Sequence, residues 1–92
     1  MNKKTEIYEL SPITSQKSFS GKAKVIIIGN KRYLRSYDTI MGCIDLATNE
    51  IHRYSDYKSH TTCKHIKSFL PYDYKKFWNL PIEEQPEITV VL

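Results

Sequence analysis

The sequence predicts an α+β fold, in which an antiparallel β-meander of three to five strands carries one main α-helix on one face and a short second helix. Three observations predict it. A pattern of β-branched and alternating apolar residues runs from Lys22 to Ser55. The pair Gly29-Asn30 interrupts this pattern with a two-residue hairpin signal. The segment Ser59–Leu70 then carries helix signals at both of its ends.

The main helix is expected at about residues 60–70. Ser59 can cap its first turn by accepting hydrogen bonds from free backbone N–H groups, and Pro71 stops it because proline disfavours the helical region for the preceding residue. At about 100° per residue, the lysines of this segment fall opposite the apolar face. A helix of roughly three turns is marginal alone in water, so the sheet must cover that face. Structural roles are therefore assigned to Ser59, Thr62, His65, Ile66 and Phe69.

The residues before the meander predict only a peripheral element. Thr5–Leu10 alternates charged and apolar residues and is closed by Pro12, which is typical of a short edge strand or a frayed terminus. Residues 11–21 are rich in serine and contain a single aromatic ring, that of Phe19. They predict a loop held down by that ring.

Within the meander, the first strand, Ala23–Ile28, is almost continuously apolar and is expected to be buried on both faces. The chain returns along Lys31–Tyr37, and residues 40–44 continue the alternation. Because Ser36-Tyr37-Asp38 has turn or bulge character, we expect the returning strand to bend there. A short loop follows, and Ile51–Ser55 pairs back.

The C-terminal part predicts a second, shorter helix and a last strand. The helix is expected over Asp73–Asn79, where three aromatic residues fall at i, i+3 and i+4: Tyr74, Phe77 and Trp78. Pro81 ends it. Beyond Pro86, Glu87–Leu92 is rich in β-branched residues and predicts a strand able to join a sheet edge.

The 92 residues are expected to form one small domain. It divides into an N-terminal edge strand and loop (1–21), the meander and helix core (22–70), and a short helix with an acidic strand (71–92). From residue 11 to 76 there are twelve basic and five acidic residues, a balance of 12 − 5 = +7, whereas residues 77–92 hold three Glu and no basic residue. A basic body favours polyanions or acidic proteins as partners, the alternative being an ordinary solvated surface.

The sequence contains neither an apolar signal-peptide core near its start nor an apolar run long enough to span a bilayer. We therefore expect a cytoplasmic protein that makes no membrane contact. Cys43 and Cys63 are expected to be reduced and dispensable thiols, because a disulfide needs an oxidising compartment.

Three segments resemble a family of small uncharacterised proteins from bacteriophages, plasmids and Gram-positive gut bacteria: Ser18–Val25, Leu34–Met41 and Ser59–Leu70. The shared pattern is a Ser-Tyr-x-Thr strand followed by a Ser-x-Thr-Thr-x-x-His-Ile helix. This chain departs from it in having His60 where a small residue is usual and Lys58 where Tyr is usual. The resemblance implies an origin in a mobile element and action in the host cytosol. The family is a domain of unknown function, so it implies no activity.

No catalytic or metal site is predicted, and no cofactor is expected. His60, Cys63 and His65 have a spacing that suggests zinc, but on a helix the last two point about 160° apart and cannot share a tetrahedral ion. Motifs for a phosphate loop, a serine nucleophile or paired carboxylates are absent. His65 is expected to be a half-buried structural residue that donates to a strand carbonyl or to the hydroxyl of Tyr37 or Thr39, with acid–base chemistry as the alternative. The protein is not expected to be an enzyme.

The most suggestive pattern is the interleaving of basic and aromatic residues along the predicted strands. Such residues on paired strands can offer stacking rings and phosphate contacts together. The alternative is that the rings cover the sheet while the basic groups extend into water. We expect a binding module that acts on nucleic acid or on a nucleic-acid-bound host protein, or else inhibits a host defence factor. The predicted basic and aromatic face comprises Lys31, Arg32, Tyr33, Arg35, Tyr37, Arg53, Tyr54, Tyr57 and Lys58.

Overall fold

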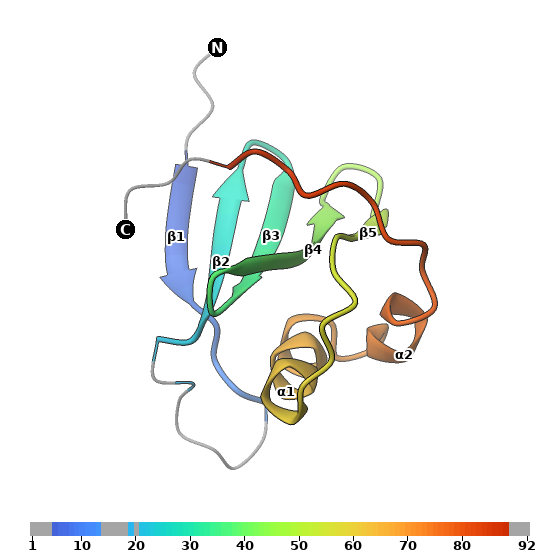
Figure 1. Cartoon of the computed structure of the whole chain (residues 1–92). Coiled ribbons are helices and arrows are strands. Elements are labelled where there is room, and N and C mark those ends of the chain that lie inside the picture. The colour runs from blue at the N-terminus through green and yellow to red at the C-terminus, as the bar shows by residue number, and fades with distance from the viewer. Residues whose placement is uncertain (1–4, 14–18, 20, 89–92) are drawn as a thin grey trace.

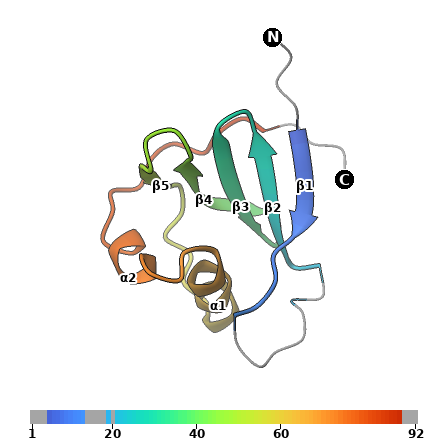
Figure 2. The same cartoon turned by 180° about the vertical axis from the view of Figure 1, so that it is seen from behind.

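A computed structural model of the chain describes residues 5–13, 19 and 21–88. Five antiparallel strands form one sheet in the order β1-β2-β3-β4-β5, and two helices follow the last strand (Figures 1 and 2). The α+β fold predicted from the sequence is therefore confirmed, with the full five strands. The elements are β1 (Thr5–Glu9), β2 (Ala23–Ile28), β3 (Lys31–Ser36), β4 (Thr39–Asp45), β5 (Ile51–Arg53), α1 (His60–Phe69) and α2 (Tyr74–Phe77).

The expected bend in the second strand was wrong, because the chain reverses there instead. Ser36 pairs with Thr39 around the turn residues Tyr37 and Asp38, so residues 31–45 form a hairpin of two strands. Tyr37 has a φ of 56°, a left-handed conformation that an aromatic residue rarely adopts, and no Gly or Asn announces it. A register shift does occur, opposite the Leu34/Arg35 step of β3.

The strand expected over residues 87–92 is not present at the two residues of this segment that the structure describes. Glu87 and Ile88 have no strand structure, and residues 89–92 lie outside the described residues. Residues 81–88 instead run along the sheet as an irregular chain (Figure 1). The Gln85 side chain ties it down by donating to the carbonyl oxygens of Ile40 and Tyr54, at 2.9 Å each.

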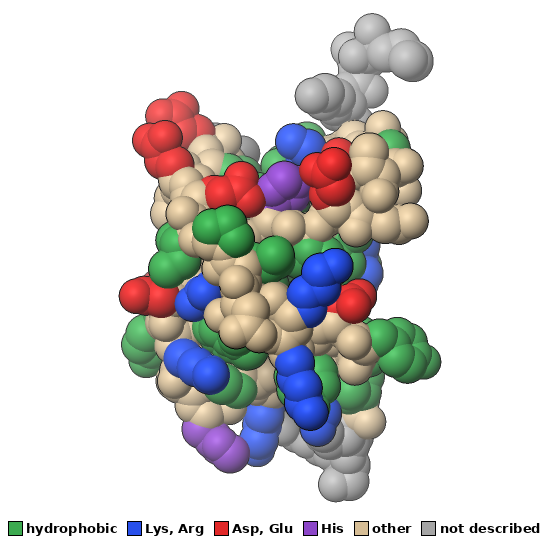
Figure 3. All heavy atoms as spheres, turned by 90° about the vertical axis from the view of Figure 1, so that its right-hand side faces the viewer, with side chains coloured by type: hydrophobic (Ala, Val, Ile, Leu, Met, Phe, Trp, Pro, Cys, Tyr) green, Lys and Arg blue, Asp and Glu red, His purple; other side chains and the backbone are tan. Residues whose placement is uncertain are grey.

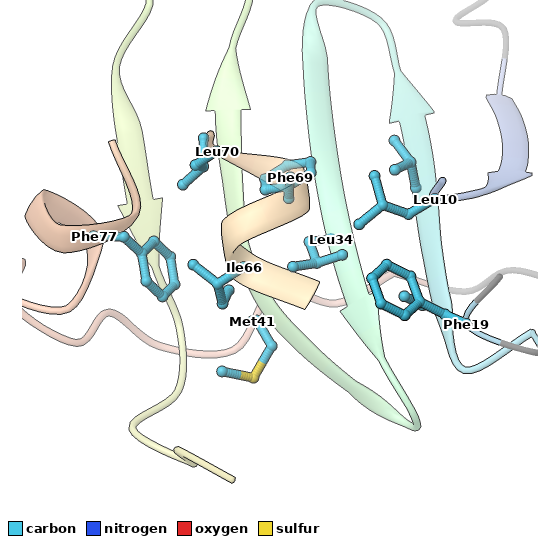
Figure 4. Packing of buried hydrophobic residues seen from close by; sticks show 10 residues of the cluster. Leu10, Phe19, Leu34, Met41, Ile66, Phe69, Leu70 and Phe77 are labelled. Carbon is cyan, nitrogen blue, oxygen red and sulfur yellow. The ribbon is translucent and has the colours of Figure 1, made fainter. Parts of the chain in front are cut away.

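The main hydrophobic core lies between α1 and one face of the sheet. Leu34 of β3 and Ile66 of α1 are completely buried at its centre, and Phe69 is 3% exposed. Figure 4 shows the side chains of Leu10 and Phe19 closing this core at the β1 and β2 end, and Phe77 closing it beside β4 and β5. Phe19 is thus anchored in the core by its ring, and α2 by the ring of Phe77. The buried members are Leu10, Phe19, Ala23, Val25, Leu34, Met41, Ile66, Phe69, Leu70 and Phe77.

The opposite face of the sheet carries a second, smaller cluster. Ile26, Tyr33 and Cys43 form its buried part, and the Tyr33 and Tyr54 rings stack with centroids 6.4 Å apart. Burial raises the pKa of the Cys43 thiol, whose Sγ lies 3.3 Å from the Tyr54 hydroxyl. Both cysteines are free, Cys43 buried and Cys63 half-buried.

Candidate binding groove between α1 and α2

The structure distributes the nine residues of the predicted basic and aromatic face over several surfaces. Neighbours along a strand point to opposite faces, so Arg32 and Tyr33 are separated by the sheet itself. The Arg32 guanidinium lies 5.3 Å from the centre of the Phe69 ring on the α1 side, whereas Tyr33 belongs to the cluster on the other side. Arg35 pairs with the exposed carboxylate of Asp38 at 3.0 Å. Strand alternation therefore does not gather these nine side chains on one face.

The remaining predicted residues lie at the ends of strands and in loops. Lys31 is exposed at the start of β3, and Tyr37 is exposed in the turn between β3 and β4. Tyr54 packs in the second cluster. Tyr57 and Lys58 lie on the exposed segment that leads into α1, and Tyr57 is 59% exposed. Of this group, only Lys58 reaches the groove described next.

A groove of about 440 Å³ lies between α1, α2 and the segment before α1. None of the described residues that line it is acidic, and four of them are lysines. Two aromatic rings, a histidine, a cysteine and an asparagine complete the lining. We call this surface the α1–α2 groove; it is lined by Lys58, His60, Cys63, Lys64, Lys67, Tyr74, Lys75, Trp78 and Asn79.

Helical periodicity explains why these side chains converge. His60, Cys63, Lys64 and Lys67 follow one another at i, i+3, i+4 and i+7, so they form a single stripe on α1. This stripe lies beside the buried face that contacts the sheet. The lining residues of the second wall come from α2 and the turn after it. Figure 3 shows Lys and Arg side chains gathered over the half of the molecule that holds the helices, with most acidic groups nearer the other end.

The position of α2 depends on a close approach to the sheet. The Phe77 ring packs so tightly on Gly42 of β4 that a Cβ atom there would lie 2.5 Å from Phe77 Cε1 and 2.5 Å from the carbonyl oxygen of His52. Only glycine leaves room for the ring at this point. The second wall of the α1–α2 groove is thus set by a contact between residues far apart in the sequence.

Arg53 fixes the end of α2 from the sheet side. Its Nη1 donates to the carbonyl oxygens of Trp78 and Leu80, and its Nε donates to that of Ser55, each at 3.0 Å. The guanidinium carbon also lies 5.3 Å from the centre of the Trp78 ring. Arg53, predicted as a binding residue, therefore points toward α2 and holds the chain that carries Trp78.

The two rings in the groove are each accompanied by an ammonium group. Lys58 Nζ lies 5.1 Å from the centre of the Trp78 ring, and Lys67 Nζ lies 5.4 Å from that of Tyr74. Both rings are half-buried and pack against the main core with part of their surface. The groove thus combines positive charge with rings whose orientation is constrained by packing.

His65 lies outside the groove, in a buried polar network behind α1. It is completely buried rather than half-buried, and its Nδ1 lies 2.7 Å from the Ser36 hydroxyl instead of contacting Tyr37 or Thr39 through a hydroxyl. The Ser36 hydroxyl lies 3.3 Å from that of Thr62, which accepts from Ser59 at 2.9 Å. This chain of hydrogen bonds ties the first turn of α1 to the β3–β4 hairpin.

The contact between Ser36 and His65 has the distance of a nucleophile–base pair, but its surroundings differ from those of a hydrolase site. Ser36 is 3% exposed, and Nε2 of the histidine has no partner among the described residues. The Phe19 ring packs edge-on against the imidazole at 4.5 Å. Burial, with the charge of Lys22, lowers the pKa of His65. A neutral, enclosed imidazole of this kind suits a structural role.

The described residues contain no group of three or more His, Cys, Asp or Glu side chains placed to hold a metal ion. His60 and Cys63 both line the α1–α2 groove, but lysines surround them. Within the described part of the chain, none of the helices has the length and apolar character to cross a membrane.

Sequence reasoning identified the groove only in fragments. The lysines of α1 were predicted to lie opposite its apolar face, and Tyr74 and Trp78 were predicted to lie on one short helix, but Lys75 was not among the predicted binding residues. The sequence offered no sign that the two helices face each other. That information lies in the contact between Gly42 and Phe77 and in the hydrogen bonds of Arg53.

Residues 8–78 match the model of a family described as "Family of unknown function (DUF8033)". This stretch includes all of α1 and α2, and every residue that lines the groove except Asn79. Neither the curated proteins nor the solved structures contain a significant match.

Proposed function

We propose that this chain, which belongs to the family of unknown function DUF8033, is a non-enzymatic nucleic-acid-binding module whose contact surface is the α1–α2 groove. One observation carries the proposal: four lysines and two aromatic rings converge on a groove in which none of the described lining residues is acidic. Phosphate groups supply the negative charge that such a surface attracts.

The basic residues of the groove are lysines, which suit contacts to the phosphate backbone of a nucleic acid better than the recognition of a base edge. Lys64, Lys67 and Lys75 are exposed, so their ammonium groups are free to move toward phosphates at different positions. A lysine acts as a flexible point charge, whereas specific recognition of a base edge more often uses the fixed fork of an arginine. Binding with little sequence preference is therefore expected.

An origin in a mobile element and action in the host cytosol are part of the same proposal, on the strength of the sequence resemblance. The alternative function is inhibition of a host defence factor by protein–protein contact. It is favoured by Tyr72, which lies in the connection between the two helices and is 97% exposed. Tyrosine is enriched among residues that dominate protein interfaces, and an acidic protein segment would also suit the lysines.

Paired charge reversals test the proposal. The variant Lys64→Glu/Lys67→Glu reverses two lysines of the groove. The control Lys31→Glu/Lys76→Glu makes the same change in net charge at exposed positions outside the groove lining. Affinity for a labelled mixed-sequence oligonucleotide is measured by fluorescence anisotropy, with folding checked by circular dichroism.

The groove variant is expected to lose at least about tenfold in affinity, and the control less than about threefold, because only close phosphate contacts are worth about 1 kcal/mol or more each. Equal losses in the two variants would mean that net charge alone drives binding. Unchanged binding by a folded groove variant would refute the proposed site.

A further inference from the structure

We infer that the α1–α2 groove takes single-stranded rather than duplex nucleic acid, with one unstacked base against the Trp78 ring and backbone phosphates on the lysines around it. This inference rests on the proposed function and specifies its substrate. It is carried by the juxtaposition of a constrained indole ring with Lys58 and with the lysine stripe of α1 in one groove.

The Trp78 ring is held in place before any ligand arrives. Phe77 packs edge-on against it, with ring centroids 5.2 Å apart and planes at 83°. The Trp78 carbonyl oxygen accepts from Arg53, which fixes the backbone behind the ring. A ring that is already ordered loses little conformational freedom on binding, so a stacking contact keeps most of its favourable free energy.

A duplex cannot use such a ring without opening, because its bases are already stacked on each other. Single strands can turn a base outward and stack it on an aromatic side chain, and this contact tolerates any base. The groove volume of about 440 Å³ lies within the range of small-ligand sites, about 300–1,000 Å³. The groove therefore suits a nucleotide-sized unit of an open strand, whereas the phosphates of a duplex could reach only the lysines at its rim.

The lysines are placed to follow the strand on either side of that base. Lys58 Nζ lies 5.1 Å from the Trp78 ring centre, and Lys67 Nζ lies 5.4 Å from that of Tyr74. Both lysine side chains are exposed, so an arriving base can displace the ammonium group, which then turns to a phosphate. One cation–π contact is exchanged for base stacking and a charge-assisted hydrogen bond.

The experiment uses Trp78 as its own reporter, because the chain contains a single tryptophan. The intact protein is titrated with a twelve-nucleotide single strand and, separately, with a hairpin duplex of the same base composition. We expect quenching of tryptophan fluorescence by the single strand and little or none by the duplex. The ratio of the two affinities is expected to be about tenfold or more.

Two aromatic substitutions provide the matched comparison. Trp78→Leu is expected to weaken single-strand binding about tenfold while leaving duplex binding unchanged. Tyr72→Leu removes a ring that is 97% exposed and lies outside the groove lining, and should leave both affinities unchanged. If Trp78→Leu fails to fold, the fluorescence titration of the wild-type protein decides alone.

The outcomes separate this inference from the proposed function. Equal affinity for single strand and duplex without quenching overturns the inference, while sensitivity to Lys64→Glu/Lys67→Glu would still support the proposed function. Absence of binding to either nucleic acid overturns both. Quenching by polyglutamate as strong as that by the single strand also overturns the inference and favours the protein-binding alternative.

Discussion

Replacing Arg53 by methionine should destabilise the fold strongly and loosen the α1–α2 groove. Methionine preserves the unbranched aliphatic stem of arginine but lacks its guanidinium group. The substitution therefore removes three hydrogen bonds, to the carbonyl oxygens of Ser55, Trp78 and Leu80. Charge-assisted hydrogen bonds contribute about 1.5–3 kcal/mol each. The site is only partly buried, so we take about 1 kcal/mol for each bond, or roughly 3 kcal/mol in all.

For a domain of this size, 1 kcal/mol corresponds to about 4–8 °C in Tm, so Arg53→Met should lower Tm by roughly 12 °C or more. The matched control is Arg35→Met, which removes an ion pair to Asp38, a side chain that is 97% exposed. Exposed pairs contribute at most about 1 kcal/mol. Thermal unfolding followed by circular dichroism compares the two variants. If Arg53→Met melted within a few degrees of Arg35→Met, the positioning role of Arg53 would be refuted.

Three further predictions concern the packing that supports the groove. Gly42→Ala should destabilise the protein by about 1–3 kcal/mol in chemical denaturation, because the added Cβ collides with Phe77 and a backbone oxygen; a wild-type unfolding midpoint would contradict the close approach. Phe69→Ala should cost about 3–5 kcal/mol, since this core residue is 3% exposed, and a melting temperature near wild type would exclude it from the core. The pKa of His65 is lowered in the folded state from its usual value of 6.5. The contribution of the neutral imidazole to stability should therefore be complete above pH 6.5, and it should be lost as the pH falls from 6.5 toward the folded-state pKa. His65→Gln should flatten this loss between pH 7 and 5, and an unchanged pH profile would contradict the prediction.

The parts of the fold that depend on local signals were predicted from the sequence. The Ser59 hydroxyl accepts from the backbone N–H of Thr62 at 3.0 Å, and α1 ends at Phe69, shortly before Pro71. Gly29-Asn30 forms the expected reversal between β2 and β3. Capping residues, proline and glycine act within a few residues of their position, so their effects can be read without knowledge of the tertiary structure.

The hairpin turn at Tyr37 and the groove could not be predicted in the same way. A left-handed tyrosine has no characteristic sequence signal and is held by the surrounding structure. The groove requires α2 to lie against α1, which depends on the distant pair Gly42 and Phe77. The prediction of a single basic and aromatic face was also inconsistent with the geometry of a β-strand. Adjacent residues in a strand, such as Arg32 and Tyr33, point to opposite faces of the sheet.

The most direct test of the central claim, that phosphates bind to the lysines of the α1–α2 groove, is the salt dependence of binding to a single-stranded oligonucleotide. Four lysines line the groove. Each phosphate neutralised on a single strand contributes about −0.7 to the slope of log K against log salt concentration. Occupation of all four lysines therefore predicts a slope of about −3, falling by about half in the Lys64→Glu/Lys67→Glu variant. A slope near zero in the wild-type protein, with affinity retained at high salt, would contradict the account.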